Sequence, residues 1–300
     1  MPNSKGLPIL FTFVPKNQMS IKDAKNYDLI VMQIKGNLKE LKQYHTVQVF
    51  DPYQFYFSFN TRLTTWKNKK NRCAVFAKMD PSKILKQYGN NGKSADNLVP
   101  SGILGYSHND HYLSDIKQEY ANITIPKKYD FCVSVVSTSI EKNYRSEYIQ
   151  MFKKLYPNAK LKIIRSCSNM NQVIEKQQCD GTLSAEKSNY LDAYEYLQVL
   201  SSLNGINPTG YYEPSLAQSI TNSQMLLTTE EKAKAYKKII QHVDDLCLMY
   251  PLFTLSYDTI FVKDDFVTPG LGQEPLNEYY LGDISFKPMS DVQVENKTNE

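Results

Sequence analysis

The segment YDFCVSVV, residues 129–136, alternates apolar and small polar side chains in the manner of a buried β-strand. It opens a series in which strand and helix patterns follow one another. YRSEYIQMFKKLY (144–156) has helical spacing, AKLKII (159–164) has the pattern of a strand, and MNQVIEKQQ (170–178) has that of a second helix. Strands that alternate with helices in this way are typical of an α/β unit, in which helices connect parallel strands. The sequence therefore predicts an α/β fold.

The clearest helix pattern lies in the C-terminal half, at residues 229–249. Thr228 and Glu231 have the spacing of a capping box, and apolar residues then recur every three or four positions. The residues expected on its buried face are Tyr236, Ile240, Val243 and Cys247. Pro251 is expected to end the helix, before a long strand at residues 252–262.

The first part of the chain mixes short strand and helix patterns. The Asp51-Pro52 step is expected to break the chain between two strands, and residues 100–112 are expected to form a loop. The other expected strands are residues 7–14, 27–33, 46–50 and 53–60, and the expected helices are residues 20–26, 36–43 and 68–78.

The composition is that of an ordinary globular protein. Of the 300 residues, 41% are hydrophobic and 22% are charged, and 35 basic against 31 acidic residues leave a net charge of +4. So small a charge gives no argument for binding to nucleic acid or to an anionic membrane surface. No segment approaches the ~20 consecutive apolar residues of a membrane-spanning helix. The first residues, 1–16, resemble a strand rather than a signal peptide.

The five cysteines are an odd number and include no CxxC pair. This pattern favours neither a zinc ribbon nor a disulfide framework. Cys132 and Cys247 each lie in an apolar run, so we expect both to be small buried hydrophobic residues.

The stretch LSAEKSNYLDAYEYL, residues 183–197, is rich in carboxylates and tyrosines. From Leu191 onward apolar residues recur at helical spacing, whereas residues 184–189 show no apolar period, so a loop that leads into a helix is expected. Asp192 is expected near the start of that helix, where a carboxylate suits the free backbone N–H groups. The stretch has three possible roles: a solvated helix, a catalytic carboxylate cluster or the wall of a ligand pocket.

Several short segments, in a fixed order, resemble those of one protein family. The segments are NYDLIV (26–31), YFSFNT (56–61), NRCAVFAKMDPSKIL (71–85), LVPSGILGY (98–106), CDGTLSAEKSNYLDAYEYL (179–197), NPTGYYEPSL (207–216) and EEKAKAYKKIIQHVDDLCLMYPLF (230–253). Taken in this order, the chain resembles the peptide/nickel family of extracellular solute-binding proteins, the receptors of bacterial ABC importers. The shared order of the segments carries the resemblance, because no single segment is specific.

The resemblance implies a periplasmic-binding-protein-like α/β fold of type II, with two lobes that close on a ligand. Residues 58–255 are expected to form the second lobe nearly whole. Residues 1–57 are expected to hold a remnant of the first lobe with a crossover strand, and residues 256–300 to return to the first lobe and end in a polar tail. Most of the first lobe is then expected to be missing, so that the chain is truncated or degenerate. Strands that lack their partner lobe leave apolar surface, expected here along residues 7–14 and 53–59. Three alternatives are open: a separate chain covers this surface, the chain is a fragment, or the first lobe has degenerated.

The resemblance also implies a ligand-binding role for the stretch 183–197. In the peptide-binding branch of the family, this region offers an aromatic surface and an aspartate that pairs with the α-ammonium group of the ligand. The aspartate position falls on Asn189, the tyrosine position on Tyr190 and the tryptophan position on Glu186. A neutral amide and a displaced carboxylate change that chemistry, so altered recognition of a peptide's α-amine is expected.

The implied function is that of the solute-binding component of an ABC transporter. Its ligand is a small solute or peptide, and its partners are the membrane subunits of the importer. A periplasmic location follows from the resemblance, while the missing export signal and the unpaired cysteines leave a cytoplasmic location open. The alternative is the cytosolic ligand-sensing domain of a transcription regulator that resembles the same family, although no helix-turn-helix pattern supports it.

Motifs for catalysis and metal binding are weak or absent. His108, Asp110 and His111 in HNDH are the best candidates for metal ligands, but no further ligand accompanies them and a polar surface loop is the better interpretation. The sequence has no GxSxG, no HExxH and no phosphate-binding glycine loop. Glu186 and Asp192 act as a catalytic pair only if an apolar pocket separates their pKa values, and no such pocket is evident. We therefore expect a binding protein without cofactor or metal, not an enzyme.

Overall fold

The computed structural model describes residues 21–30, 41–86, 92–107, 112–136, 145–164, 168–188, 190–201, 207–267 and 285–286. The chain divides into two compact units, one formed by residues 1–51 and 257–300 and the other by residues 52–256. The lobe boundaries expected after residues 57 and 255 stay a prediction.

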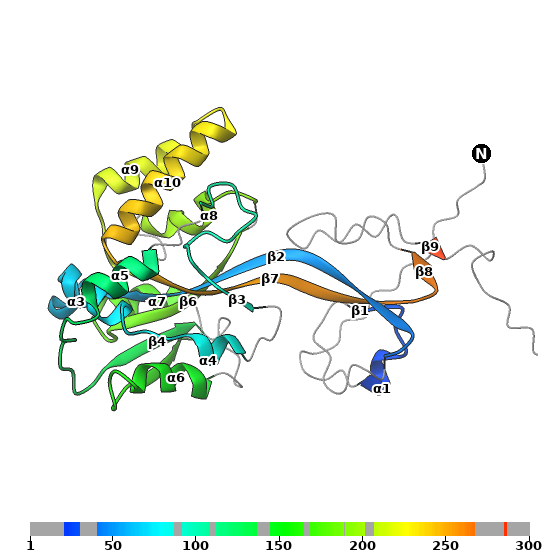
Figure 1. The fold of residues 1–300 in the computed structure, drawn as a ribbon, viewed down its shortest axis with the longest axis horizontal. Helices are drawn as coiled ribbons and strands as arrows, with labels where there is room; N and C mark the ends of the chain where they lie inside the picture. The colour runs from blue at the N-terminus through cyan, green and yellow to red at the C-terminus, as the bar shows by residue number, and fades with distance from the viewer. Residues whose placement is uncertain are drawn as a thin grey trace, which may run out of the picture. The chain divides into compact units, whose positions relative to one another are not determined.

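The fold is built on one mixed β-sheet (Figure 1). Among the described residues it has seven strands, in the order β1-β7-β2-β6-β4-β5, with β3 also paired to β7. The strands are β1 (Leu29–Ile30), β2 (Tyr44–Phe59), β3 (Gly92–Ser94), β4 (Cys132–Val136), β5 (Lys160–Ile164), β6 (Gly181–Lys187) and β7 (Met249–Lys263). β4 is parallel to β5 and to β6, whereas β2 and β6 are antiparallel. The predicted α/β class is confirmed.

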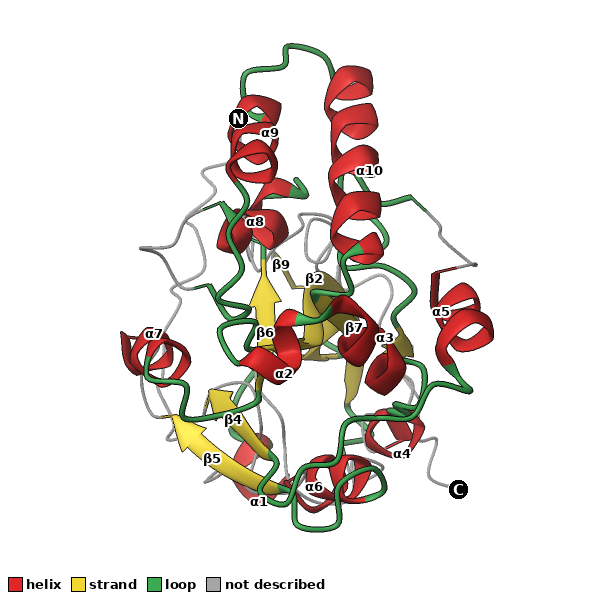
Figure 2. Ribbon diagram, turned by 90° about the vertical axis from the view of Figure 1, so that its left-hand side faces the viewer, coloured by secondary structure: helices red, strands yellow, loops and turns green. Residues whose placement is uncertain are grey.

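Two helices connect the parallel strands and cover opposite faces of the sheet (Figure 2). α6 (Arg145–Lys153) follows β4 and packs into the same core as Val133. α7 (Ser168–Glu175) follows β5 and belongs to a separate cluster, against which Cys132 packs. Since neighbouring residues of a strand point to opposite faces, Val133 and Cys132 mark the α6 side and the α7 side of the sheet.

The main hydrophobic core lies on the α6 side of the sheet. The buried rings that β2 contributes to it are Phe55, Phe57 and Phe59. Phe59 stacks on Trp66 of α2 (Thr64–Lys67), with 4.1 Å between the ring centroids. The expectation that residues 53–59 expose apolar surface is therefore wrong for Phe55, Phe57 and Phe59, because other elements of the same unit cover their rings. Residues 7–14, the other expected surface, lie outside the described part of the chain.

Three more short helices lie between β2 and β4: α3 (Lys69–Phe76), α4 (Ser82–Leu85) and α5 (Tyr112–Tyr120). The helix expected at residues 68–78 is confirmed as α3, and the Asn68 side chain caps it by accepting the N–H of Lys70 at 2.9 Å. α5 is an addition to the expected elements, beginning where the expected loop ends.

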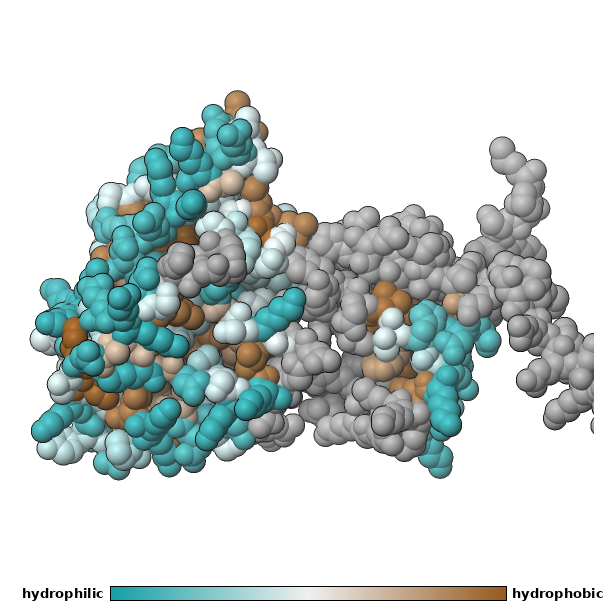
Figure 3. All heavy atoms as spheres, viewed as in Figure 1, coloured by the Kyte–Doolittle hydropathy of each residue, from teal (hydrophilic) through white to brown (hydrophobic). Residues whose placement is uncertain are grey.

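A helical hairpin of α9 (Pro214–Ser223) and α10 (Thr229–Asp245) precedes the last long strand. The capping box between Thr228 and Glu231 is formed, as expected. The residues expected on the buried face, all of them buried, are Tyr236, Ile240, Val243 and Cys247. The turn between the helices carries two exposed apolar side chains, Met225 and Leu227, on a surface that is otherwise mostly hydrophilic in the view of Figure 3.

The expected end of α10 at residue 249 is wrong. The helix ends at Asp245, and Cys247 has a φ of 47°, a left-handed conformation that an α-helix of L-residues does not continue through. Pro251, expected to end the helix, instead lies within β7. Among the described residues no helix has the length and apolar character needed to cross a bilayer.

The smaller unit contains α1 (Ile21–Ala24), β1 with Phe261 and Val262 of β7 that pair with it, and a two-stranded sheet of β8 (Phe266–Val267) and β9 (Ser285–Phe286). A small core of Ala24, Ile30, Leu41 and Phe261 holds it together. The Lys263 ammonium group pairs with the Asp28 carboxylate at 2.7 Å.

β2 runs without interruption from Tyr44 to Phe59, so the break expected at Asp51-Pro52 is wrong.

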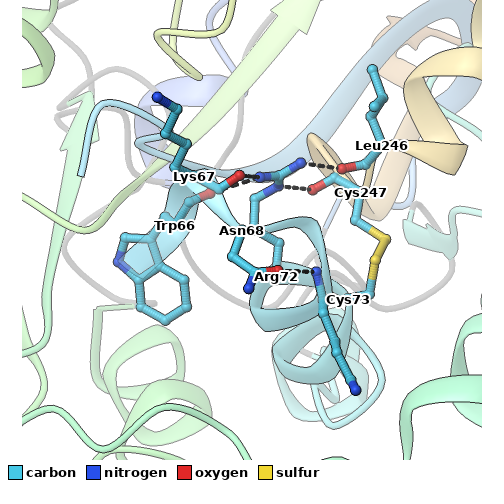
Figure 4. The surroundings of a disulfide bond; sticks show 8 residues. Trp66, Lys67, Asn68, Arg72, Cys73, Leu246 and Cys247 are labelled. Atoms are coloured by element: carbon cyan, nitrogen blue, oxygen red, sulfur yellow. Dashed lines mark hydrogen bonds between the residues drawn. A yellow bond between two sulfur atoms is a disulfide. The ribbon is translucent and has the colours of Figure 1, made fainter. Parts of the chain in front are cut away.

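Cys73 on α3 and Cys247 after α10 form a disulfide, with their Cα atoms 5.5 Å apart (Figure 4). The expectation that Cys247 is only a small hydrophobic residue is therefore wrong, and so is the expectation that the cysteines form no disulfide. The two residues are 174 positions apart in the chain, and no local pattern connects them. In the chain-entropy account, closing a loop of this size stabilises the folded state by about 5 kcal/mol.

The side chain of Arg72 lies beside this disulfide (Figure 4). It is buried, and its guanidinium group donates hydrogen bonds to main-chain carbonyl groups at two helix ends. The accepting carbonyls belong to Trp66, Lys67, Leu246 and Cys247. A cation suits the carboxyl end of a helix, where carbonyl groups lack helical partners. Burial lowers the pKa of Arg72 to about 10, so the group is still charged at neutral pH.

Candidate ligand-binding site

The strand β6 carries the expected site residue Glu186 and lies between β2 and β4 in the sheet. In its pairing with β2, Glu186 is opposite Gln54 and Ser184 is opposite Tyr56. The expectation of a loop at residues 184–189 is therefore wrong for the part up to Lys187. A two-residue alternation is present in this segment, with Leu183 buried in the main core and Ala185 packed against it.

A row of polar side chains lies on the face of β2 and β6 that is turned away from the main core. Gln54 and Thr254 of β7 are buried there, and the Thr254 hydroxyl donates to the Gln54 carbonyl oxygen at 2.7 Å. The Tyr56 hydroxyl donates to Glu186 Oε1 at 3.3 Å. Ser184 lies two residues before Glu186 on β6, opposite Tyr56, and its buried hydroxyl has no hydrogen-bond partner among the described residues. We call these five residues the polar row.

Burial controls the ionisation of Glu186. It raises the pKa of the carboxyl group from 4.5 to about 7, against the hydrogen bond from Tyr56, which lowers it. The negative charge of Glu195 adds a smaller upward shift in this pKa. Near neutral pH the group is therefore present in both forms, and it can either donate or accept a hydrogen bond.

Tyr190 follows β6 and has an exposed side chain, with 67% of its surface accessible. Its backbone N–H donates to the hydroxyl of buried Ser188 at 3.2 Å, which fixes the chain direction at this point. Tyr53, at the same end of the β2–β6 pair, has the Lys187 ammonium group 5.4 Å from its ring centre. Asn189, the third expected site residue, lies outside the described residues.

Asp192 has a structural role in this region. Its carboxylate accepts the backbone N–H of Tyr194 at 2.9 Å, at the start of α8 (Tyr194–Leu197), as expected. It also accepts the hydroxyl of Tyr236 and pairs with the Lys232 ammonium group at 3.4 Å, both on α10. Asp192 thus ties this segment to α10, and its bonding partners differ from those of Glu186.

The structure adds little information on the other candidate sites. His108, Asp110 and His111 lie outside the described residues. Within the described ranges, no three His, Cys, Asp or Glu residues are grouped so as to hold a metal ion. A cavity of about 390 Å³ lies between α5 and α10, and its lining contains neither Glu186 nor Tyr190.

Sequence reasoning did not identify Tyr56, Gln54 or Thr254 as neighbours of the site. The signal for the first two was the strict alternation of polar and aromatic residues in YQFYFSFN, which places one polar face on β2. The register that brings this face to Glu186 joins residues far apart in the chain, and a single sequence does not contain it.

No protein-family model and no curated protein matches the chain. Solved structures match it closely in fold. HbpA2 from Haemophilus parasuis has a TM-score of 0.67 and 19% identity, over 88% of this chain and 55% of that protein. The dipeptide binding protein from Pseudoalteromonas sp. SM9913, in complex with Met-Leu, has a TM-score of 0.65 and 15% identity over the same shares. Haemophilus influenzae OppA, in complex with the peptide RPPGFSPFR, has a TM-score of 0.63 and 16% identity, again over 88% and 55%.

The chain thus spans about half the length of the solved proteins that it matches. The expected resemblance to peptide-type solute-binding proteins is confirmed at the level of structure, and it is a partial one. The described residues have the fold of type II periplasmic binding proteins, over about half the length of those proteins.

Proposed function

We propose that this protein is a solute-binding component of an ABC importer and that its ligand is a peptide or a similar small solute. Glu186, Tyr190 and Asn189 are its proposed ligand-contacting residues. The observation that carries the proposal is the placement of a half-buried carboxyl group, Glu186, near the end of β6 and shortly before the exposed Tyr190, in a fold shared with peptide-binding proteins.

The chemistry proposed for this site differs from that of a fixed carboxylate facing an ammonium group. A desolvated ammonium ion needs an opposite charge, and Asn189 supplies only a neutral amide. Glu186 is only partly ionised near neutral pH, because burial raises its pKa to about 7. The proposed site therefore selects ligands less by an α-ammonium group than by hydrogen bonds and by stacking on the Tyr190 ring.

The disulfide supports a compartment outside the cytosol. Intrachain disulfides persist in oxidising surroundings such as the bacterial periplasm and are rare in the cytosol. The same bond counts against the alternative of a cytosolic regulator, which none of the three structures named above supports. The proposed partners are the membrane subunits of an importer. A form of the protein that closes on a ligand also needs the other half of the fold, which either the same polypeptide or another chain supplies.

Calorimetry with a mixed pool of short peptides tests the proposal. The unaltered protein is expected to bind peptides with a free amino terminus weakly, and N-acetylated peptides about equally well. Asn189→Asp restores a carboxylate, and because a desolvated charge pair is worth roughly 2–5 kcal/mol, binding of free-amine peptides should tighten by roughly thirtyfold or more.

The matched control is Asn189→Leu, which removes the amide without adding charge and should not favour free amines. Tight binding of free-amine peptides that is indifferent to every change at Asn189 would contradict the proposed site. With the other half of the fold supplied, absence of any peptide binding, in the unaltered protein and in Asn189→Asp alike, would contradict the proposed function.

A further inference from the structure

Two cysteines outside the disulfide lie in contact with each other. Cys132 begins β4, and Cys179 lies just before β6, which is the parallel neighbour of β4. Cys132 packs against the apolar cluster in which Cys179 lies, and each thiol affects the acidity of the other. The main chain fixes this approach, because the N–H of Asp180 donates to the carbonyl oxygen of Cys132 at 2.7 Å, and the Asp180 carboxylate accepts the N–H of Cys132 at 2.9 Å.

Both thiols lie on the α7 side of the sheet. Cys179 is buried within the cluster that Ile164 of β5 forms with apolar residues of α7, and Cys132 packs against this cluster while keeping part of its surface accessible. The pair therefore has one cysteine that is partly exposed to solvent and one that is buried.

The two thiols also differ in acidity. The hydrogen bond from Cys179 lowers the pKa of the Cys132 thiol, with smaller help from Lys162 and Lys160. The same hydrogen bond, together with burial, raises the pKa of Cys179. Because the thiolate is the reacting form, Cys132 is the attacking group and Cys179 the one that reacts second.

We propose that Cys132 and Cys179 form a dithiol redox site, which a disulfide-bearing oxidant converts into a second intrachain disulfide. The thiolate of Cys132 attacks one sulfur of the oxidant, R–S–S–R. This forms a mixed disulfide and releases one R–S⁻, which takes up a proton. Cys179 then loses its proton to solvent and attacks the Cys132 sulfur, releasing the second R–S⁻. Two cysteine thiols are oxidised and one R–S–S–R is reduced to two R–SH, so atoms and electrons balance.

The bond would join the start of β4 to the start of β6, the strand that carries Glu186. The bonds between Cys132 and Asp180, the chain neighbour of Cys179, hold the two segments at the spacing of paired strands, which lies within the range that a disulfide spans. The proposal is independent of the ligand and holds whatever the protein binds.

The test uses the full chain with oxidised glutathione as the oxidant. Cys167 lies outside the described residues, so Cys167→Ser serves as the starting protein and removes a competing thiol. After incubation at mildly alkaline pH, acid quenching and alkylation in denaturant, digestion without reductant reports the state of each cysteine. The expected product is a Cys132–Cys179 linked peptide, lighter by two hydrogen atoms than its reduced parts and lost on treatment with dithiothreitol.

Two single variants separate the roles of the thiols. Cys179→Ser should stop at a stable mixed disulfide of glutathione on Cys132, whereas Cys132→Ser should leave Cys179 free for alkylation after denaturation. Circular dichroism checks that both variants are folded, and Cys132→Ala and Cys179→Ala replace any that is not. A stable glutathione adduct on Cys132 with Cys179 intact, or full alkylation of both thiols while Cys73 and Cys247 stay oxidised, would overturn the proposal.

Discussion

Glu186 occupies a position where burial and hydrogen bonding act on its ionisation in opposite directions. Burial dominates, and the pKa of the folded state is about 7 instead of 4.5. Between these two values the folded chain keeps a proton on Glu186 that the unfolded chain has already lost. Because the folded state binds more protons in this window, its stability falls as the pH rises from about 4.5 towards 7, and then stays level with respect to this group.

This titration predicts the behaviour of a Glu186→Gln variant. The amide keeps the shape and a hydrogen-bond acceptor for Tyr56 but does not ionise. Relative to the unaltered protein, the variant should gain about 2 kcal/mol in unfolding free energy between pH 5 and pH 8. Urea unfolding at the two pH values measures the gain. Glu230→Gln, at an exposed position of α10, is the control and should change little; equal gains for both variants would contradict the assignment.

Glu186 could be proposed as a site residue from the sequence, but its surroundings could not be predicted. Its position followed from the resemblance of the segment 179–197 to a family pattern. The acidity of the group depends on burial and on Tyr56, a residue 130 positions away in the chain. Such a contact depends on strand register, which a single sequence does not specify.

At the scale of the secondary-structure elements, prediction succeeded where the determinants are local. The start of α10 was predictable because Thr228 and Glu231 bond to each other across one turn. Its end was not, because Cys247 leaves the helix to form a disulfide with a distant residue. The C-terminal part of β6 was missed for a similar reason: Glu186 and Lys187 are polar, and pairing with β2 makes this segment a strand.

The burial of α10 gives a prediction about Ile240. Its side chain is 2% exposed and lies on the face that packs against the rest of its unit. Ile240→Asp places an unpaired carboxylate there, so we expect a loss of about 3–5 kcal/mol in unfolding free energy. Lys234→Asp introduces the same side chain at an exposed position of the same helix and should cost less than about 1 kcal/mol. Thermal unfolding of both variants is the measurement, and similar melting temperatures would contradict the placement of Ile240.

At the scale of the whole molecule, the disulfide links helices from the two ends of the larger unit. Cys73 on α3 and Cys247 after α10 enclose most of residues 52–256 between them. The constraint acts chiefly on the unfolded chain, whose freedom it reduces. Its partners were not predictable, because cysteine spacing alone carries no information on which pair meets in space.

Reduction should therefore lower the stability of the whole unit. We expect Cys73→Ser combined with Cys247→Ser to lose about 2–5 kcal/mol in unfolding free energy relative to the oxidised protein. Added reductant should destabilise the unaltered protein by a similar amount and leave the double variant unchanged. Urea unfolding with and without dithiothreitol measures both effects. A double variant that remains sensitive to reductant would point to a different disulfide as the stabilising one.

The loop closed by Cys73 and Cys247 also has a mechanical consequence. When the protein is pulled by its two ends, the force passes through the sulfur–sulfur bond instead of through the chain between the two cysteines, which are 174 positions apart. At about 3.5 Å of extended length per residue, this hides roughly 600 Å of chain from the applied force. A stretched oxidised molecule would then reach a shorter final extension, because the chain between the cysteines carries no force. Adding reductant under load would release that length in a single step.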